Sequence, residues 1–189
     1  MRKDFGAKTW LYPQPVFVIA TYGPDGKPDA MCAAWGGITY DDQLSICVDD
    51  SHLTADNLAH CDAFTVSMAT ERYAAECDYL GIVSARDEPD KLAKSGLHAE
   101  KAPHVNAPLI SELPLAIECR LLGYDAERCL LVGQIVNVSA DESILGSDGK
   151  IDVGLLSPIT FDPVHNKYLP LGAPVADAFM AGLAVRDAL

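Results

Sequence analysis

Apolar and polar positions along this chain form short runs, and most of the runs are rich in β-branched and aromatic residues. Runs of this kind, bounded by Gly, Pro, Asn and Asp, predict β-strands. About six strands are expected, and a last apolar segment is shorter than the others. We place these segments at residues 15–22, 29–35, 44–48, 63–68, 115–124, 129–139 and 159–161.

Helical spacing is confined to brief segments between or after the strands. The expected helices span residues 53–59, 71–80, about 90–94, and 173–185 at the C-terminus. Asp25-Gly26 is a strong signal for a hairpin between the first two strands. A parallel α/β sheet needs a helix after nearly every strand, which is not seen here. The pattern therefore predicts a mainly β chain, built as an antiparallel barrel with short α-helices.

Length and charge narrow the function classes. At 189 residues a single domain over 1–189 is expected, since chains divide mainly above about 250–300 residues. The net charge is −13 and no basic stripe is present, which argues against nucleic acid or an anionic membrane surface as a partner. No apolar run approaches the roughly 20 residues of a membrane helix, and the N-terminal segment lacks the apolar stretch of a signal peptide. We expect a cytoplasmic location.

Cysteine and histidine usage gives no sign of a metal site. The six cysteines include no C-x-x-C pair and lie mostly in apolar stretches, so reduced, buried thiols are expected. His98 and His104 flank Glu100, but no third and fourth ligand stands at a definable spacing. We therefore predict no bound metal.

The most informative segment lies between Asp29 and Asn57. Small residues (Ala33, Ala34, Gly36 and Gly37) surround one indole, that of Trp35, which would let a flat ring lie against the backbone. Thr54 stands where it can cap the following helix, and helix N-termini offer N–H groups to phosphate. The combination suits a phosphorylated aromatic cofactor. Trp35 could instead be a barrel core residue and Thr54 a purely structural cap. Four scarce cations could neutralise a phosphate: Arg86, Lys91, Lys94 and Arg128.

The order of several motifs resembles the flavin reductase-like FMN-binding split-barrel family, and within it the flavoredoxin branch. After the Asp-Gly hairpin and AAWGG come DYLGIVSARDEPDK, APLI, LPLAIEC, VGQIV, DGKID and PITFDP, which together span nearly the whole chain. The resemblance implies a six-stranded antiparallel Greek-key split barrel. It also implies one non-covalent FMN, in preference to FAD, and a homodimer.

The resemblance also implies where a flavin would bind. Trp35 would lie beside the isoalloxazine, Thr54 and Lys91 would serve the phosphate, and Phe161 would be a nearby aromatic. Two positions depart from the family pattern: Asp29 stands where Asn is common, and Arg128 falls near a frequent His. Arg128 could compensate as a cation. The full set of predicted cofactor-binding residues is Asp29, Ala33, Ala34, Trp35, Ser51, Thr54, Ser84, Lys91, Arg128 and Phe161.

Two flavin-dependent functions remain open at this point, beside a third reading in which the barrel has lost flavin and acts as a structural or ligand-binding module. One is an oxidoreductase of the flavin reductase type that takes electrons from NAD(P)H, with no fixed general acid or base and no Rossmann motif. The other is an electron carrier that receives electrons from a redox protein. The acidic composition suits docking to a basic partner.

Overall fold

A seven-stranded antiparallel sheet forms the body of the molecule in the computed structural model, which describes residues 1–186. The strands follow the order β2-β1-β5-β8-β9-β4-β3 across the sheet. Their bounds are β1 Phe17–Tyr22, β2 Pro28–Ala33, β3 Gly36–Tyr40, β4 Gln43–Cys47, β5 Ala63–Met68, β8 Leu115–Asp125 and β9 Leu130–Ala140. Each neighbouring pair is antiparallel, as the sequence predicts.

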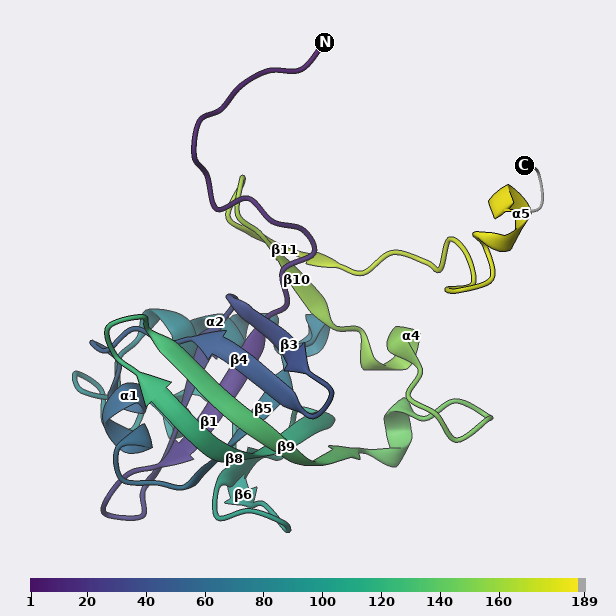
Figure 1. Cartoon of the computed structure of the whole chain (residues 1–189). Coiled ribbons are helices and arrows are strands. Elements are labelled where there is room, and N and C mark those ends of the chain that lie inside the picture. Colours follow the sequence, from purple (N-terminus) through teal and green to yellow (C-terminus); the bar gives the residue numbers. More distant parts are fainter. Residues whose placement is uncertain (187–189) are drawn as a thin grey trace.

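The sheet curls because strands that are adjacent in sequence lie at its opposite edges. β2 and β3 are the two outermost strands, yet only Ala34 and Trp35 separate them in the chain. The Cys47 amide donates to the Trp35 carbonyl at 2.7 Å, which ties this connection to the end of β4. Figure 1 shows the curl of the sheet, and buried apolar side chains fill its interior.

Short helices and two small hairpins complete the fold. Their bounds are α1 Leu53–Leu58, α2 Ala74–Ile82, α3 Lys91–Ser95, α4 Val153–Leu156, α5 Leu183–Arg186, the 3-10 turns Glu71–Tyr73 and Glu142–Ile144, the hairpin of β6 Ala99–Lys101 with β7 Pro108–Ile110, and the hairpin of β10 Ile159–Asp162 with β11 Lys167–Pro170. Among residues 1–186, no helix is both long and apolar enough to cross a membrane.

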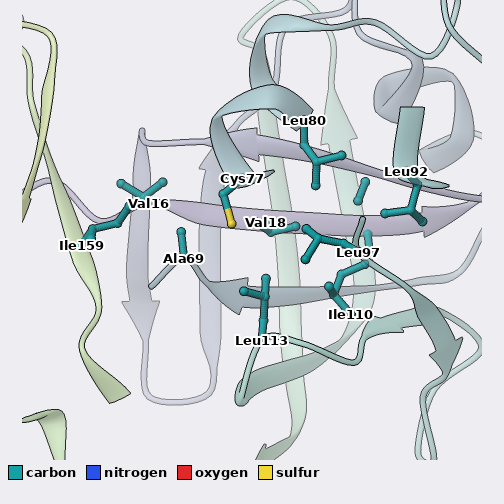
Figure 2. Close-up of a cluster of buried hydrophobic side chains, with 12 residues drawn as sticks. Val16, Val18, Ala69, Cys77, Leu80, Leu92, Leu97, Ile110, Leu113 and Ile159 are labelled. Carbon is teal, nitrogen blue, oxygen red and sulfur yellow. The ribbon is translucent and has the colours of Figure 1, made fainter. Parts of the chain in front are cut away.

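Two apolar clusters stabilise the sheet from its two faces. One contains Phe64 and Leu131, and it also holds Ile19, Ile46 and Val66. The other lies where α2 and the β6–β7 hairpin cover β1, and Figure 2 shows Cys77 and Leu80 pointing from the helix toward Val18. Burying side chains of this size contributes about 1.5–3 kcal/mol each, so the two clusters supply the main stabilisation of the curled sheet.

Several expectations about elements need correction. The structure has seven strands in the main sheet and two further hairpins, where about six strands in one barrel are expected. Residues 173–185 do not form one helix: residues 173–177 are exposed and irregular, 178–182 form turns, and only 183–186 is helical. The pattern misleads because an apolar helical face needs a surface to pack on, and this segment leaves the body. In Figure 1 both terminal segments project away from the sheet, near the β10–β11 hairpin.

Candidate functional site

A cavity of about 190 Å³ lies where the start of β2 meets α1 and the chain that follows α2. It brings together four residues that the sequence indicates, Asp29, Thr54, Ser84 and Lys91, although they come from four separate segments. We call this the β2 cavity. Its remaining lining is Met31, His52, Leu53, Leu80, Gly81, Ile82, Val83 and Ala85.

An ion pair is buried in the wall of the β2 cavity. Lys91 Nζ lies 3.4 Å from Asp29 Oδ1, and the two residues are only 3% and 6% exposed. Lys91 Nζ also donates to the carbonyl oxygens of Leu80, at 3.4 Å, and Val83, at 3.2 Å. These contacts occupy the three N–H donors of the ammonium. Lys91 therefore joins β2 to the end of α2, and it has no donor left for a ligand in this arrangement.

The ion pair with Lys91 gives a partner to only one of the two carboxylate oxygens of Asp29. Its Oδ1 faces Lys91, while its Oδ2 has no hydrogen-bond partner among the residues described. Burial raises the pKa of Asp29, and the nearby Lys91 lowers it without cancelling the shift. Burial disfavours the charged form of a carboxyl group, which explains the direction. Asp29 also borders a second cavity of about 310 Å³, with Lys27, Asn57 and Pro89.

The expectation that Thr54 caps α1 is wrong. The helix begins at Leu53, the capping position is His52, and no side chain caps it. Thr54 lies inside the first turn of α1. It is buried, and it is one of the residues that line the β2 cavity. Thr54 stands two positions beyond the capping position, and a cap must precede the first helical residue.

Arg86 connects two loops beside the β2 cavity. Its Nε donates to the carbonyl of Ser51 at 3.2 Å, and its own amide donates to Ser84 Oγ at 3.2 Å. Its guanidinium also pairs with Asp56 at 2.7 Å. Ser51 itself is exposed, with its hydroxyl donating to Asp49 at 2.6 Å. Arg86 is thus the cation that links the Ser51 and Ser84 segments, a role that the charged run around it in the sequence does not reveal.

An aromatic cluster lies beyond the other end of β2. Trp35 is 49% exposed and makes an edge-on contact with Phe161, with ring centroids 6.1 Å apart. Phe161 in turn packs against Tyr168 at 6.1 Å, and the Tyr168 hydroxyl donates to Asp78 at 2.7 Å. Burial raises the pKa of Tyr168, so its hydroxyl stays protonated. Trp35 is therefore not a core residue, and the structure brings it into contact with Phe161, another of the predicted cofactor-binding residues.

The small residues around Trp35 have separate structural reasons. Ala33 is half-buried at the end of β2 and Ala34 is buried. A Cβ on Gly36 would lie 2.6 Å from the Ser45 carbonyl oxygen, so the close approach of β3 to β4 requires glycine there. A Cβ on Gly37 would meet nothing within 4 Å. Only part of the small-residue stretch thus leaves open surface next to the indole.

Arg128 is not brought to the β2 cavity. It lies in the turn between β8 and β9, its side chain is 79% exposed, and its Nε is 3.7 Å from Asp125. The turn contacts the chain after β4, where the Val48 amide donates to the Cys129 carbonyl at 2.8 Å. A role for Arg128 as a compensating cation stays a prediction.

The thiols near the site are protonated at neutral pH. All six cysteines are free and described. Burial raises the pKa of Cys32, on β2, and of Cys77, on α2, to about 12 in each case. A reactive cysteine needs an electropositive, partly exposed environment. Cys32 and Cys77 are packing residues.

The arrangement provides an aromatic surface and a polar cavity along one strand. Asp29 and Trp35 are six positions apart, which is roughly 20 Å of extended chain. A molecule with a flat ring system and a polar tail could contact both ends.

The family model described as flavin reductase like domain matches residues 9–158. A comparison with curated proteins found no significant match.

Solved structures give close matches over almost the whole chain. A flavoredoxin of Desulfovibrio vulgaris (Miyazaki F) is 36% identical, with a TM-score of 0.91 over 96% of this chain and 100% of that one. A flavoredoxin from Methanosarcina acetivorans is 25% identical, with a TM-score of 0.86 over 98% and 99%. An FMN-binding domain of a flavin reductases-like enzyme from Shewanella baltica OS155 is 14% identical, with a TM-score of 0.78 over 87% and 89%, which bears on the fold alone. The chain belongs to the flavin reductase-like domain family, and its likeness is to the flavoredoxins within it.

Proposed function

We propose that this protein binds FMN and acts as an oxidoreductase of the flavin reductase type, passing electrons from NAD(P)H through the bound flavin. The observation that carries the proposal is the half-exposed indole of Trp35, held by Phe161 at the end of the strand that begins in the β2 cavity. A large aromatic side chain left in solvent, on the same stretch of chain as a polar cavity, is expected at a ligand site.

The residues present fit a flavin. The isoalloxazine would lie against Trp35 and Phe161, with the backbone of Ala33 and Ala34 beside its pyrimidine edge. The polar tail would enter the β2 cavity, where Thr54 and Ser84 supply hydroxyl groups. The unpaired Oδ2 of Asp29 is a further acceptor inside the protein.

In this proposal, one cation of the site, Lys91, has a structural role, and another, Arg86, contributes to binding. Lys91 acts by holding the loop and by neutralising Asp29, since its donors are occupied. Arg86 and Ser51 are next in sequence to the lining residues Ala85 and His52, and in this proposal the phosphate would lie beside them. FMN, when bound, would supply the hydride and electron chemistry, and the protein would supply binding, orientation and electrostatics.

A spectrum and a turnover assay test the proposal. Purified protein incubated with FMN and passed through a desalting column should keep the visible absorption of flavin. Steady-state oxidation of NADH or NADPH in the presence of free flavin should exceed roughly 1 s⁻¹, the low end of ordinary turnover numbers. Protein that retains no flavin would overturn the proposal.

An electron carrier is the second candidate, favoured by the 36% identity to a flavoredoxin and by the net charge of −13. Flavin would then stay bound and receive electrons from a protein partner with a basic surface. If neither NADH nor NADPH is oxidised, but a protein donor such as a ferredoxin reduces the bound flavin rapidly, the carrier is favoured over the enzyme.

We also propose that the protein is a homodimer. Strands β3, β8 and β9 carry large exposed apolar side chains, and these are Ile38, Tyr40, Leu122, Leu130, Val136 and Val138. Exposed apolar side chains that gather on a soluble protein commonly mark interaction sites. The terminal segments add further exposed apolar residues, such as Val175 and Phe179, that would pack on a second copy.

A further inference from the structure

The β10–β11 hairpin carries Phe161 and Tyr168, and it is a two-stranded sheet of its own, outside the main sheet. The two residues are directly opposite in the register of the hairpin, so their side chains lie on the same face. Both rings pack against the apolar cluster that holds Cys77 and Leu80. Of the four residues of β11, all of which are described, Tyr168 is the one that is not exposed. Tyr168 is therefore the side chain of β11 that packs on the body of the protein.

The hydroxyl group of Tyr168 has its partner on a helix that is fixed in the core. It donates to Asp78 Oδ1 at 2.7 Å. Asp78 belongs to α2, which is anchored by Cys77 and Leu80, 0% and 1% exposed. A hydrogen bond to a carboxylate is stronger than one between neutral groups. The hydroxyl end of Tyr168 is thus held by α2, while its ring contacts Phe161.

Trp35 depends on this hairpin for its aromatic contact. The indole is 49% exposed, and among the described residues Phe161 is the one whose ring it touches. A half-exposed side chain has few neighbours that fix its orientation, so Phe161 limits where the indole can point. Phe161 is itself supported by Tyr168. The contacts form one series from the helix to the indole: Asp78, Tyr168, Phe161 and Trp35.

We propose that Asp78 is a positioning residue for the ligand: through Tyr168 it holds Phe161 in place, so that the indole of Trp35 keeps one orientation toward a planar ring system. The inference rests on the proposed function, in which the isoalloxazine lies against Trp35 and Phe161. Asp78 makes no contact with the ligand in this proposal. Its substitution leaves the ligand-contacting side chains present and changes only how they are held.

The test removes each end of the hydrogen bond separately. Tyr168→Phe and Asp78→Ala abolish the bond, whereas Asp78→Asn keeps an oxygen that can accept from the phenol. The dissociation constant of FMN, measured by fluorescence titration, should rise about threefold or more in the first two variants, a loss within the range of one contact between aromatic rings. In Asp78→Asn it should stay within about twofold of wild type, because the acceptor is retained.

A second readout follows the indole without any ligand. The chain has two tryptophans, so in a Trp10→Ala background the tryptophan fluorescence comes from Trp35 alone. The anisotropy of that fluorescence should fall by roughly a third in Tyr168→Phe and in Asp78→Ala, because a side chain that has lost its support reorients within nanoseconds. It should keep the wild-type value in Asp78→Asn. A merely structural role of Asp78 would lower the unfolding temperature and leave the anisotropy unchanged.

Tyr12→Phe is the matched control. The Tyr12 hydroxyl also donates to a carboxylate, that of Asp162, and it joins the N-terminal segment to the same hairpin. Both readouts should keep their wild-type values in this variant, because Tyr12 lies outside the series that ends at the indole.

Several outcomes would overturn the proposal. These are an unchanged FMN affinity or an unchanged anisotropy in either Tyr168→Phe or Asp78→Ala, equal changes in Tyr12→Phe, and an Asp78→Asn variant as impaired as Asp78→Ala. If Asp78→Ala does not fold, Tyr168→Phe, which loses only a hydroxyl group, is judged by the same criteria. Wild-type protein that binds no FMN would refute the proposed function itself, and the anisotropy would still decide whether Asp78 positions the indole.

Discussion

At the scale of single residues, Glu118 is a buried carboxylate whose environment is fully arranged around its charge. It is 0% exposed and accepts hydrogen bonds from the His104 amide at 2.8 Å, from His104 Nδ1 at 2.9 Å and from Asn137 Nδ2 at 2.9 Å. Burial alone would raise the pKa of Glu118, but the bonds from Asn137 and His104 outweigh it, and the pKa lies below its ordinary value. The ionised form is therefore part of the fold.

This arrangement predicts a stability loss that depends on pH. Glu118→Gln should lower the free energy of unfolding by about 1–3 kcal/mol near neutral pH, because an amide cannot replace all of the acceptor sites of the charged group. A group whose pKa is lowered on folding stabilises the protein above its unfolded pKa, and that stabilisation is lost as the pH falls through the folded pKa. The deficit of the variant should therefore shrink between about pH 5 and pH 3, measured by urea unfolding.

Glu112→Gln is the matched control for that measurement. Glu112 holds the amide and Nδ1 of His98 in the same way, at 2.9 and 2.6 Å, but near the surface. Water can replace lost partners there, so its deficit should be clearly smaller. Equal losses in the two variants would contradict the role assigned to burial.

Trp35 offers a second test at the residue scale. Trp35→Ala should change the free energy of unfolding by no more than about 0.5 kcal/mol, because the indole is half-exposed. Flavin affinity should fall about 2- to 10-fold, since a favourable contact between aromatic rings contributes about 0.5–1.5 kcal/mol. Calorimetry would measure both quantities. Trp10→Ala, which removes an indole from the N-terminal segment, should leave flavin affinity unchanged.

At the scale of elements, the contact between β9 and β5 depends on the absence of one side chain. A Cβ on Gly133 would lie 2.4 Å from Cζ of Phe64 and 3.2 Å from Cβ of Cys119. Gly133→Ala should therefore destabilise the protein by about 1–3 kcal/mol, as overpacked cores do. Thermal unfolding would detect this. Gly123→Ala, on β8, would meet nothing within 4 Å and should have little effect.

The strands were the most predictable elements, and the reasons are local. The segment 63–68 is β-branched and aromatic, and it forms β5 with the expected bounds. The three-residue strands β6 and β7 were not predicted, because so short a segment cannot show the alternation of apolar and polar residues that marks a strand. The helix expected over 173–185 failed because a helical pattern alone does not supply the surface that stabilises a helix.

Part of the lining of the β2 cavity was predictable from the sequence, but its contacts were not. Order and spacing of motifs indicate Asp29, Thr54, Ser84 and Lys91, and the structure gathers all four around one cavity. Lys91 pairs with Asp29, which is 62 positions away in the chain. The local sequence around either residue does not predict this pair. Charged runs are usually solvated, and only tertiary packing shows which of their members is buried.

At the scale of the whole molecule, the exposed apolar side chains of β3 and β9 predict the oligomeric state. Wild-type protein should sediment with twice the mass of the 20.2 kDa chain. A double variant, Tyr40→Glu with Val138→Glu, should shift the protein toward monomer, because it places charges at two of these exposed positions. Retained circular dichroism would show that the fold survives. A wild-type monomer would contradict the dimer.

The curled sheet has one further consequence. Its two outermost strands meet at residues 34 and 35, so a molecule held over the indole there would contact both of the least-paired strands at once. Opening either strand would then require release of that molecule. Amide hydrogens of residues 28–33 and 36–40 should accordingly exchange with deuterium more slowly once the ligand is present, and by the same factor. Ligand binding and the local unfolding of the two sheet edges are then linked, so that tighter binding makes both edges open less often.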